Sequence, residues 1–302
     1  MGSLPGERFR SQVNERTLEA LVLDAAPREQ PLIYPGAWPA ESGLLHGDTY
    51  LRLCPEADQG LDRWPVESAD AGRRMPLDQV LADAGEPLTA DRVPVLSVGS
   101  NACPGQLRYK MTGLGVSSTI PMTEVRATGV EVGVSAHVSP LGYVSASPFH
   151  APGRTRRLFV TWLDAVQLEI IDHSEGVFTP DGAYDRVFLP ADRFPMEMPS
   201  GELLNGVHAY VHRLGVLRDG TGAPRLHPGE RRLLTDLLAE SRRLREWFGD
   251  TPEEFSARAR GDEALCEKGT RLLKDEGLAM WSGLESLVTG PPTSLSGEGV
   301  PA

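Results

Sequence analysis

A buried strand that ends in a glycine-containing bend is the feature that most restricts how this chain folds. The apolar, β-prone run Val93–Val98 predicts a buried strand, and the segment Leu107–Met111 predicts a short helical turn. Between them, Gly99–Asn101 forms a bend that can direct several backbone N–H groups toward one point. Such a nest binds a carboxylate or a developing oxyanion. Because Gly-Ser-Asn is also ordinary turn chemistry, the bend needs a second feature to indicate a site.

That second feature is an acidic residue at the end of a predicted amphipathic helix. Asp164 and Gln167 have the spacing of a capping box, so the helix should begin there, and Gly176 should end it. Glu175 then lies at the C-terminus of the helix, where the helix dipole is unfavourable to an anion. Half-buried beside Val177, this carboxyl would have its pKa raised toward the range of a general base. A solvated surface acid is the alternative.

The composition excludes some classes of partner. The formal net charge of −12 argues against nucleic-acid binding, which needs a basic face, and against docking on anionic membranes. No apolar run approaches membrane-spanning length, and the first residues lack the apolar core of a secretion signal. Three widely spaced cysteines indicate a reducing compartment without a disulfide framework. We therefore expect a soluble, cytoplasmic protein, whose oligomeric state the sequence leaves open.

The first 90 residues contain no recognisable motif. We expect an N-terminal extension of unknown role over 1–90, which packs against the main domain or is partly mobile. Within it, apolar spacing predicts a short helix over 14–23, strands over 31–35 and 48–53, and a helix over 76–84.

From Val93 onward, strands precede helices, which predicts an α+β fold with a closed or strongly curved mixed sheet and helices outside. Apolar and β-branched residues predict strands over 124–138, 142–149, 156–163, 184–189 and 207–217. Amphipathic patterns predict helices over 228–248, from Thr251 onward, and over 262–284. We assign a main domain to 91–220, a helical segment to 221–288 and a disordered tail to 289–302.

Alternating polar residues in the last predicted strand offer a different chemistry. His208, Tyr210 and His212 would point to one face of that strand, and the two histidines could bind a metal ion. No third ligand has a suggestive spacing, so a partly polar sheet face is the preferred interpretation. Cys103, beside the bend, would need a nearby histidine to become a nucleophile. A packed thiol is preferred for it.

Taken in order, these segments resemble the γ-glutamylcyclotransferase family. That family begins its domain with a strand that ends in Tyr-Gly-Ser-Asn, followed by Pro and Gln-Leu, and the matching residues here are Val98, Gly99, Ser100, Asn101, Pro104, Gln106 and Leu107. Its catalytic acid lies in a Leu-Asp-x-x-Glu-Gly-like segment, which Asp172–Gly176 resembles, and Ala209–Val211 is similar to its later Ala-Tyr-Val strand. The resemblance covers roughly residues 93–217, and Val98 takes the place of the family's Tyr.

The resemblance implies a small mixed β-barrel or curved sheet with flanking helices, and a reaction that needs no cofactor and no metal. The free α-amine of a γ-glutamyl group would attack its own γ-carbonyl, which releases 5-oxoproline and an amine or amino acid. Glu175 would be the catalytic residue and would move the proton. The substrate-binding residues would be Val98, Gly99, Ser100, Asn101 and Tyr210.

Two other hypotheses stay open. A catalytically inactive small-molecule or protein-binding relative would keep the fold without the chemistry; Val98 favours it and Glu175 opposes it. A metal-dependent hydrolase would use His208 and His212. Nothing in the sequence names the γ-glutamyl substrate.

Overall fold

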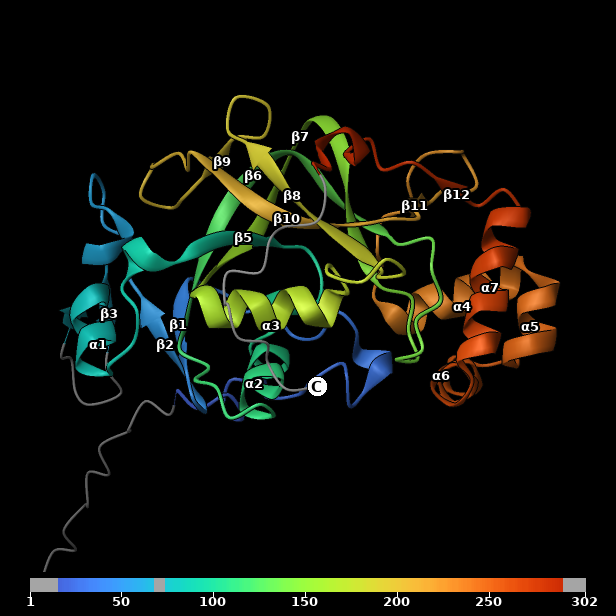
Figure 1. Cartoon of the computed structure of the whole chain (residues 1–302), viewed down its shortest axis with the longest axis horizontal. Helices are drawn as coiled ribbons and strands as arrows, with labels where there is room; N and C mark the ends of the chain where they lie inside the picture. Colours follow the sequence, from blue (N-terminus) through green and yellow to red (C-terminus); the bar gives the residue numbers. More distant parts are fainter. Residues whose placement is uncertain (1–15, 68–73, 290–302) are drawn as a thin grey trace, which may run out of the picture.

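One curved sheet of ten strands runs through most of the protein (Figure 1). The computed structural model describes residues 16–67 and 74–289. The strand order is β4-β3-β2-β1-β6-β7-β5-β10-β8, and β9 pairs with β6. The strands are β1 Gly43–His46, β2 Thr49–Leu53, β3 Pro65–Glu67, β4 Arg74–Pro76, β5 Val93–Ser97, β6 Ile120–Val134, β7 Ala146–Leu163, β8 Tyr184–Pro190, β9 Met196–Glu197 and β10 Gly206–His212.

The sheet is mixed and open. β5 and β10 pair in parallel, whereas their other neighbours pair with them in antiparallel fashion. In the part of the chain that the structure describes, the two end strands β4 and β8 do not pair, so the sheet does not close into a barrel. The expected β-barrel is therefore wrong, and the alternative expectation of a curved mixed sheet in an α+β fold is confirmed.

Two long antiparallel strands, β6 and β7, form the centre of the sheet. Their sequences predict a break over 150–155, yet β7 continues through it. The register between the two strands shifts between Thr128 and Gly129, and Gly129 has a φ of 85°. A bulge of this kind bends a strand without ending it. Residues 150–155, which separate the two predicted strands, thus lie within one strand.

The last turn of helix α3 lies beside the bend that follows β5. The helices are α1 Leu77–Asp83, α2 Pro104–Thr112, α3 Ala165–Glu175, α4 Glu230–Glu240, α5 Arg242–Phe248, α6 Pro252–Gly261 and α7 Glu263–Asp275. The predicted capping box is confirmed, because Asp164 accepts from the Gln167 N–H at 2.9 Å and Gln167 accepts from the Asp164 N–H at 3.2 Å. Gly176 ends the helix at a φ of 75°. Leu168 packs with Leu107 of α2 in one core cluster on the sheet (Figure 1).

Strands β1 to β4 continue the sheet at the edge opposite β8 (Figure 1). They join it through the antiparallel pairing of β1 with β6. The strand predicted over 48–53 and the helix predicted over 76–84 are confirmed by β2 and α1.

Two elements predicted before β1 are wrong. The helix over 14–23 begins outside the described residues, and its described part forms turns in which the Leu18 N–H donates to the Asp48 carbonyl. The strand over 31–35 is a 3₁₀ turn at Pro31–Ile33. These short apolar segments cover the sheet, and burial against it determines their conformation more than local propensity does.

Helices α4 to α7 pack together at one end of the molecule (Figure 1). The single helix predicted over 228–248 is two helices, because Ser241 lies between them with a φ of −115° and caps α5 by accepting from the Leu244 N–H. The helix predicted over 262–284 is too long. It ends before Gly277, which has a φ of 71°.

The strand predicted over 207–217 is also interrupted. β10 ends at His212, Gly215 turns the chain at a φ of 74°, and β11 (Val216–Leu217) pairs with β12 (Ala279–Met280) in a separate small sheet. Of the predicted tail, the residues from 290 onward lie outside the described part.

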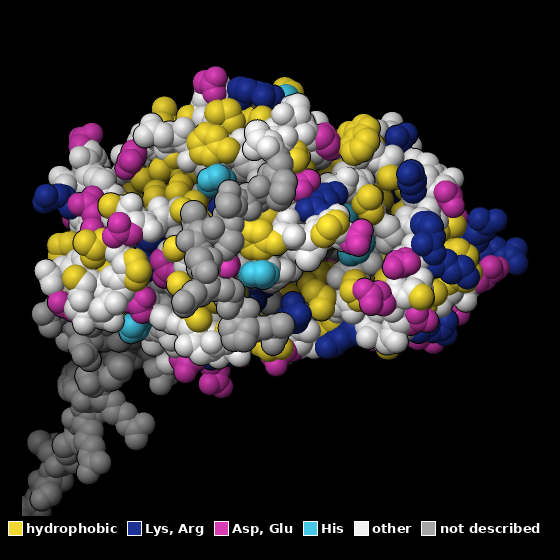
Figure 2. Space-filling view, in the orientation of Figure 1, with side chains coloured by type: hydrophobic (Ala, Val, Ile, Leu, Met, Phe, Trp, Pro, Cys, Tyr) yellow, Lys and Arg dark blue, Asp and Glu magenta, His cyan; other side chains and the backbone are white. Residues whose placement is uncertain are grey.

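Charged side chains are spread over the face in Figure 2, where Lys and Arg gather over the C-terminal helices. Among the described helices, none has the length and apolar character needed to cross a bilayer.

The capping box predicts a measurable stability effect. Asp164→Ala removes the acceptor for the Gln167 N–H and should lower the free energy of unfolding by about 1 kcal/mol. Urea denaturation measures this change. Asp192→Ala, at an exposed position, is the matched control and should change the free energy by less than about 0.5 kcal/mol. Equal losses in both variants would contradict a capping role.

Candidate functional site

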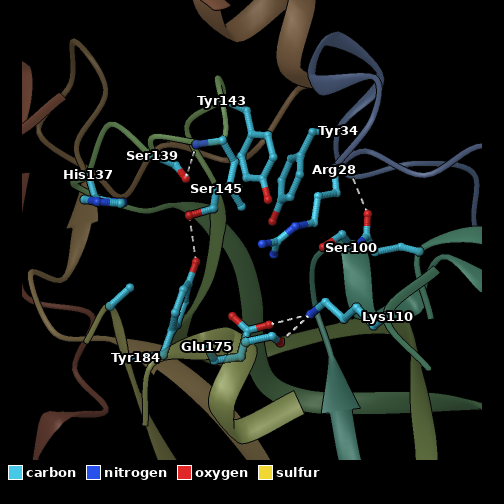
Figure 3. Close-up of a pocket in the computed structure, with 14 residues that line it drawn as sticks. Arg28, Tyr34, Ser100, Lys110, His137, Ser139, Tyr143, Ser145, Glu175 and Tyr184 are labelled. Atoms are coloured by element: carbon cyan, nitrogen blue, oxygen red, sulfur yellow. Dashed lines mark hydrogen bonds and ion pairs between the residues drawn. The ribbon is translucent and has the colours of Figure 1, made fainter. Parts of the chain in front are cut away.

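A cavity lies where β5 ends, between the bend, α2 and the last turn of α3 (Figure 3). It has two adjoining parts, which share Tyr34, Ser100, Glu175 and Tyr184. We call the part at the bend the loop pocket. It is lined by all six residues predicted for the site, namely Val98, Gly99, Ser100, Asn101, Glu175 and Tyr210. The other part, the outer pocket, is lined by residues that include Arg28, Lys110, His137, Ser139 and Tyr143.

Glu175 is held from one side by two donors. Its Oε1 accepts from Asn101 Nδ2 at 3.1 Å and from Lys110 Nζ at 3.0 Å. Lys110 also donates to Asn101 Oδ1 at 2.9 Å and to Ser174 Oγ at 2.8 Å. The side chains of Lys110 and Glu175 are only 7% and 15% exposed. The second carboxylate oxygen makes no hydrogen bond within the described residues and points into the cavity (Figure 3).

The bend brings backbone donors to the same cavity. Ser100–Ala102 forms a 3₁₀ turn, and Pro104 then begins α2. The first N–H groups of a helical turn have no acceptor inside the turn, so Ser100 and Asn101 can donate to a ligand. Glycine is required at position 99, because a Cβ there would overlap the hydroxyl of Tyr34.

Tyr210 belongs to a buried polar group behind the loop pocket. Its hydroxyl donates to Asp172 Oδ1 at 2.7 Å, and Arg186 Nε lies 3.2 Å from the same oxygen. Burial raises the pKa of Asp172, and the hydrogen bond from Tyr210 partly opposes this change. The Tyr210 hydroxyl therefore already has an acceptor in the protein, and its ring forms part of the pocket wall.

Tyr34, Lys110 and Tyr184 line the cavity besides the six predicted residues. Of these, Tyr34 carries no signal in the sequence. Tyr34 comes from the segment before β1 and stacks on Tyr143, with ring centroids 4.5 Å apart. Tyr184 donates to Ser145 Oγ at 2.7 Å. Lys110 has a weak signal, since it lies in the helical turn predicted directly after the bend.

Arg28 adds a cation to the outer pocket. Its backbone N–H donates to Gln106 Oε1 at 2.9 Å, which fixes this turn of the chain on α2. Its guanidinium points into the cavity (Figure 3) and makes no hydrogen bond or ion pair with any described residue. Because Lys110 is already paired with Glu175, Arg28 makes the cavity suitable for a ligand with a negative group.

The two histidines of the metal hypothesis have different neighbours in the structure. His212 Nδ1 accepts from the Leu214 N–H at 3.1 Å, and its ring lies 5.0 Å from that of His137. His208 packs on Phe188 instead. Across residues 16–67 and 74–289, no three His, Cys, Asp or Glu side chains come together in a way that could hold a metal ion.

Cys103 is a packed thiol. It is completely buried, and its Sγ donates to the Ala25 carbonyl at 3.4 Å. Burial raises the pKa of this thiol, which disfavours the thiolate that a nucleophile requires.

Comparisons with known proteins find little. No family model matches the chain, and no curated protein matches it. A solved structure described as a gamma-glutamyl cyclotransferase is 14% identical over 40% of this chain and 66% of that chain, with a TM-score of 0.32. An uncharacterized protein from Homo sapiens is 15% identical over 40% and 67%, with a TM-score of 0.29. This chain thus spans about two thirds of each relative. Likenesses this weak do not indicate a function for this chain.

His137 and His212, whose rings lie side by side, predict a pH dependence of stability. Burial lowers the pKa of His137 from 6.5 to about 4 and also lowers that of His212. Between pH 6.5 and about 4 the unfolded chain binds protons that the folded protein does not, so the free energy of unfolding should fall as the pH falls. His137→Gln should reduce this fall, as measured by urea denaturation at pH 7.5 and 5.0. His173→Gln, at an exposed position of α3, is the control. The interpretation fails if both variants keep the wild-type slope.

Proposed function

We propose that this protein is a γ-glutamylcyclotransferase-like enzyme, which cyclises a γ-glutamyl group to 5-oxoproline and releases an amine or amino acid. One observation carries the proposal: a fixed carboxylate, Glu175, and the backbone donors of Gly99–Asn101 face a single cavity. The resemblance of the sequence to that family rests on these same residues.

The geometry supports a division of roles. A γ-glutamyl substrate binds as its ammonium ion, which must lose a proton before its nitrogen can attack. The free oxygen of Glu175 is directed into the cavity and would accept that proton. The nitrogen then bonds to the γ-carbonyl carbon, and the carbonyl oxygen becomes an oxyanion that the N–H groups of Ser100 and Asn101 stabilise. The amide C–N bond breaks as Glu175 returns the proton to the leaving nitrogen. Glu175 also takes the second proton from the ring nitrogen and passes it to the released amine, so that 5-oxoproline keeps one N–H and Glu175 ends as a carboxylate.

Lys110 would act as a positioning residue. It holds one oxygen of Glu175 and leaves the other for the substrate. Its positive charge would also disfavour the nearby substrate ammonium ion relative to the free amine, because like charges repel. The attacking amine is then easier to form.

Arg28 supports the choice of substrate. Every γ-glutamyl group carries an α-carboxylate, and the unpaired guanidinium of Arg28 supplies a cation in the cavity. The remaining task is to hold the substrate in a folded conformation, which is a matter of orientation. Such a mechanism needs no metal and no cofactor.

The second candidate is an inactive relative that binds a small molecule or a protein. Val98 favours it, because this buried side chain stands where the resembling family has a tyrosine. Incubation of the purified protein with γ-glutamyl dipeptides and γ-glutamyl amines, followed by detection of 5-oxoproline by mass spectrometry, separates the two. Among residues 16–67 and 74–289, no cluster of side chains favours the metal-dependent hydrolase.

Glu175→Gln should lower kcat for 5-oxoproline release by at least about 100-fold, because an amide cannot accept the proton. The side chain keeps its size and an oxygen for the donors Asn101 and Lys110. Glu246→Gln, at an exposed position of α5, should keep wild-type activity and serves as the control. Release that continues at the wild-type rate in Glu175→Gln would overturn the mechanism.

A further inference from the structure

We propose that Tyr34 is a catalytic residue whose hydroxyl donates a hydrogen bond to the oxyanion formed at the γ-carbonyl. This inference rests on the proposed function. It assigns a chemical role to a segment before β1 that carries no recognisable motif and lies far in sequence from the bend and from Glu175.

The Tyr34 hydroxyl has an unused donor at the centre of the cavity. Its oxygen accepts from the Ala146 N–H at 2.8 Å, and the residue lines both the loop pocket and the outer pocket. In the described part of the chain, no acceptor receives its hydrogen. Two neighbouring tyrosines differ in this respect, because Tyr184 donates to Ser145 and Tyr210 donates to Asp172. Tyr34 is thus free to donate to a ligand.

The hydroxyl lies directly against the bend. A Cβ on residue 99 would overlap it, so the absence of a side chain at Gly99 is what allows this approach. Tyr34 and the two residues that carry the backbone donors, Ser100 and Asn101, therefore line the same loop pocket. An oxyanion there would receive hydrogen bonds from two directions.

The ring is fixed before any substrate binds. Tyr34 is only 4% exposed and stacks on Tyr143, and its ring centroid lies 5.4 Å from that of His227. Its backbone carbonyl accepts from the Glu230 N–H at 3.0 Å, which attaches the segment to α4. A donor that is already oriented stabilises a developing charge without reorganisation at the moment of reaction.

The hydroxyl also keeps its hydrogen. Burial raises the pKa of Tyr34 well above its ordinary value of 10, and the charge of Glu175 acts in the same direction. The phenol is therefore neutral across the physiological range and acts as a donor. During the reaction it forms a hydrogen bond to the oxyanion and transfers no proton. Proton movement stays with Glu175.

The test is Tyr34→Phe, which keeps the ring and its stacking and removes only the hydroxyl. We expect kcat for 5-oxoproline release to fall by about 100-fold or more, the cost of losing one oxyanion donor. KM should change less than about threefold, because the oxyanion exists only in the transition state. The pH profile should keep its shape, since Glu175 still carries the proton.

The matched control is Tyr50→Phe. Tyr50 is equally buried, and its hydroxyl donates to the Glu41 carbonyl at 2.9 Å, away from the cavity. Tyr50→Phe should lose about as much stability as Tyr34→Phe, as measured by thermal melting. Its kcat should stay within about threefold of wild type. A fall in kcat common to both variants would show a structural effect and overturn the proposal.

A second variant covers the case in which Tyr34→Phe fails to fold. Gly99→Ala places a methyl group where the hydroxyl lies and should also lower kcat strongly. Where both single variants fold, the double variant gives a further test. Adding Gly99→Ala to Tyr34→Phe should lower kcat by a smaller factor than Gly99→Ala does in the wild-type protein, because the hydroxyl that the methyl group displaces is already absent. Unchanged kcat in Gly99→Ala would overturn the proposal.

The outcomes separate this proposal from the proposed function. If Tyr34→Phe keeps kcat while Glu175→Gln loses it, the cyclotransferase stands and the role of Tyr34 is wrong. If the wild-type protein releases no 5-oxoproline from any γ-glutamyl compound, both proposals fall.

Discussion

The geometry of the site depends on the buried ion pair between Lys110 of α2 and Glu175 of α3, which meet beside Asn101. Taking two charges out of water is costly, and good geometry with additional hydrogen bonds is what offsets that cost. Here Asn101 and Ser174 supply those bonds. The pair therefore connects two helices and the bend after β5, and it decides where the free carboxylate oxygen points.

The strand order of the sheet brings the two residues of this pair together. β5 lies between β7 and β10, so the bend that follows it emerges in the interior of the sheet and not at an edge. The apolar faces of α2 and α3 share one core on that sheet, which brings the ends of the two helices together. Tyr34 then reaches the same place from the segment before β1, and α4 holds that segment by the Glu230 N–H.

Much of the site was predictable because its signals are local. Three of these signals depend only on neighbouring residues: the capping box of α3, the left-handed Gly176 that ends this helix, and the apolar strand before Gly99. Each is found where the sequence pattern predicts it. The long strand β7 and the broken helix at Ser241 were mispredicted because sheet pairing and helix packing overrode the local signal. The same is true of the 3₁₀ turn at Pro31–Ile33, whose apolar residues indicated a strand.

By itself, the sequence determined the elements that carry Glu175 and the bend, because turn chemistry and capping act over three or four residues. Tertiary structure alone decided that Lys110 pairs with Glu175, that the Tyr210 hydroxyl is occupied by Asp172, and that Tyr34 and Arg28 complete the cavity. These contacts join residues far apart in the chain. No local sequence pattern predicts these contacts, because burial and pairing across the sheet determine which side chains meet.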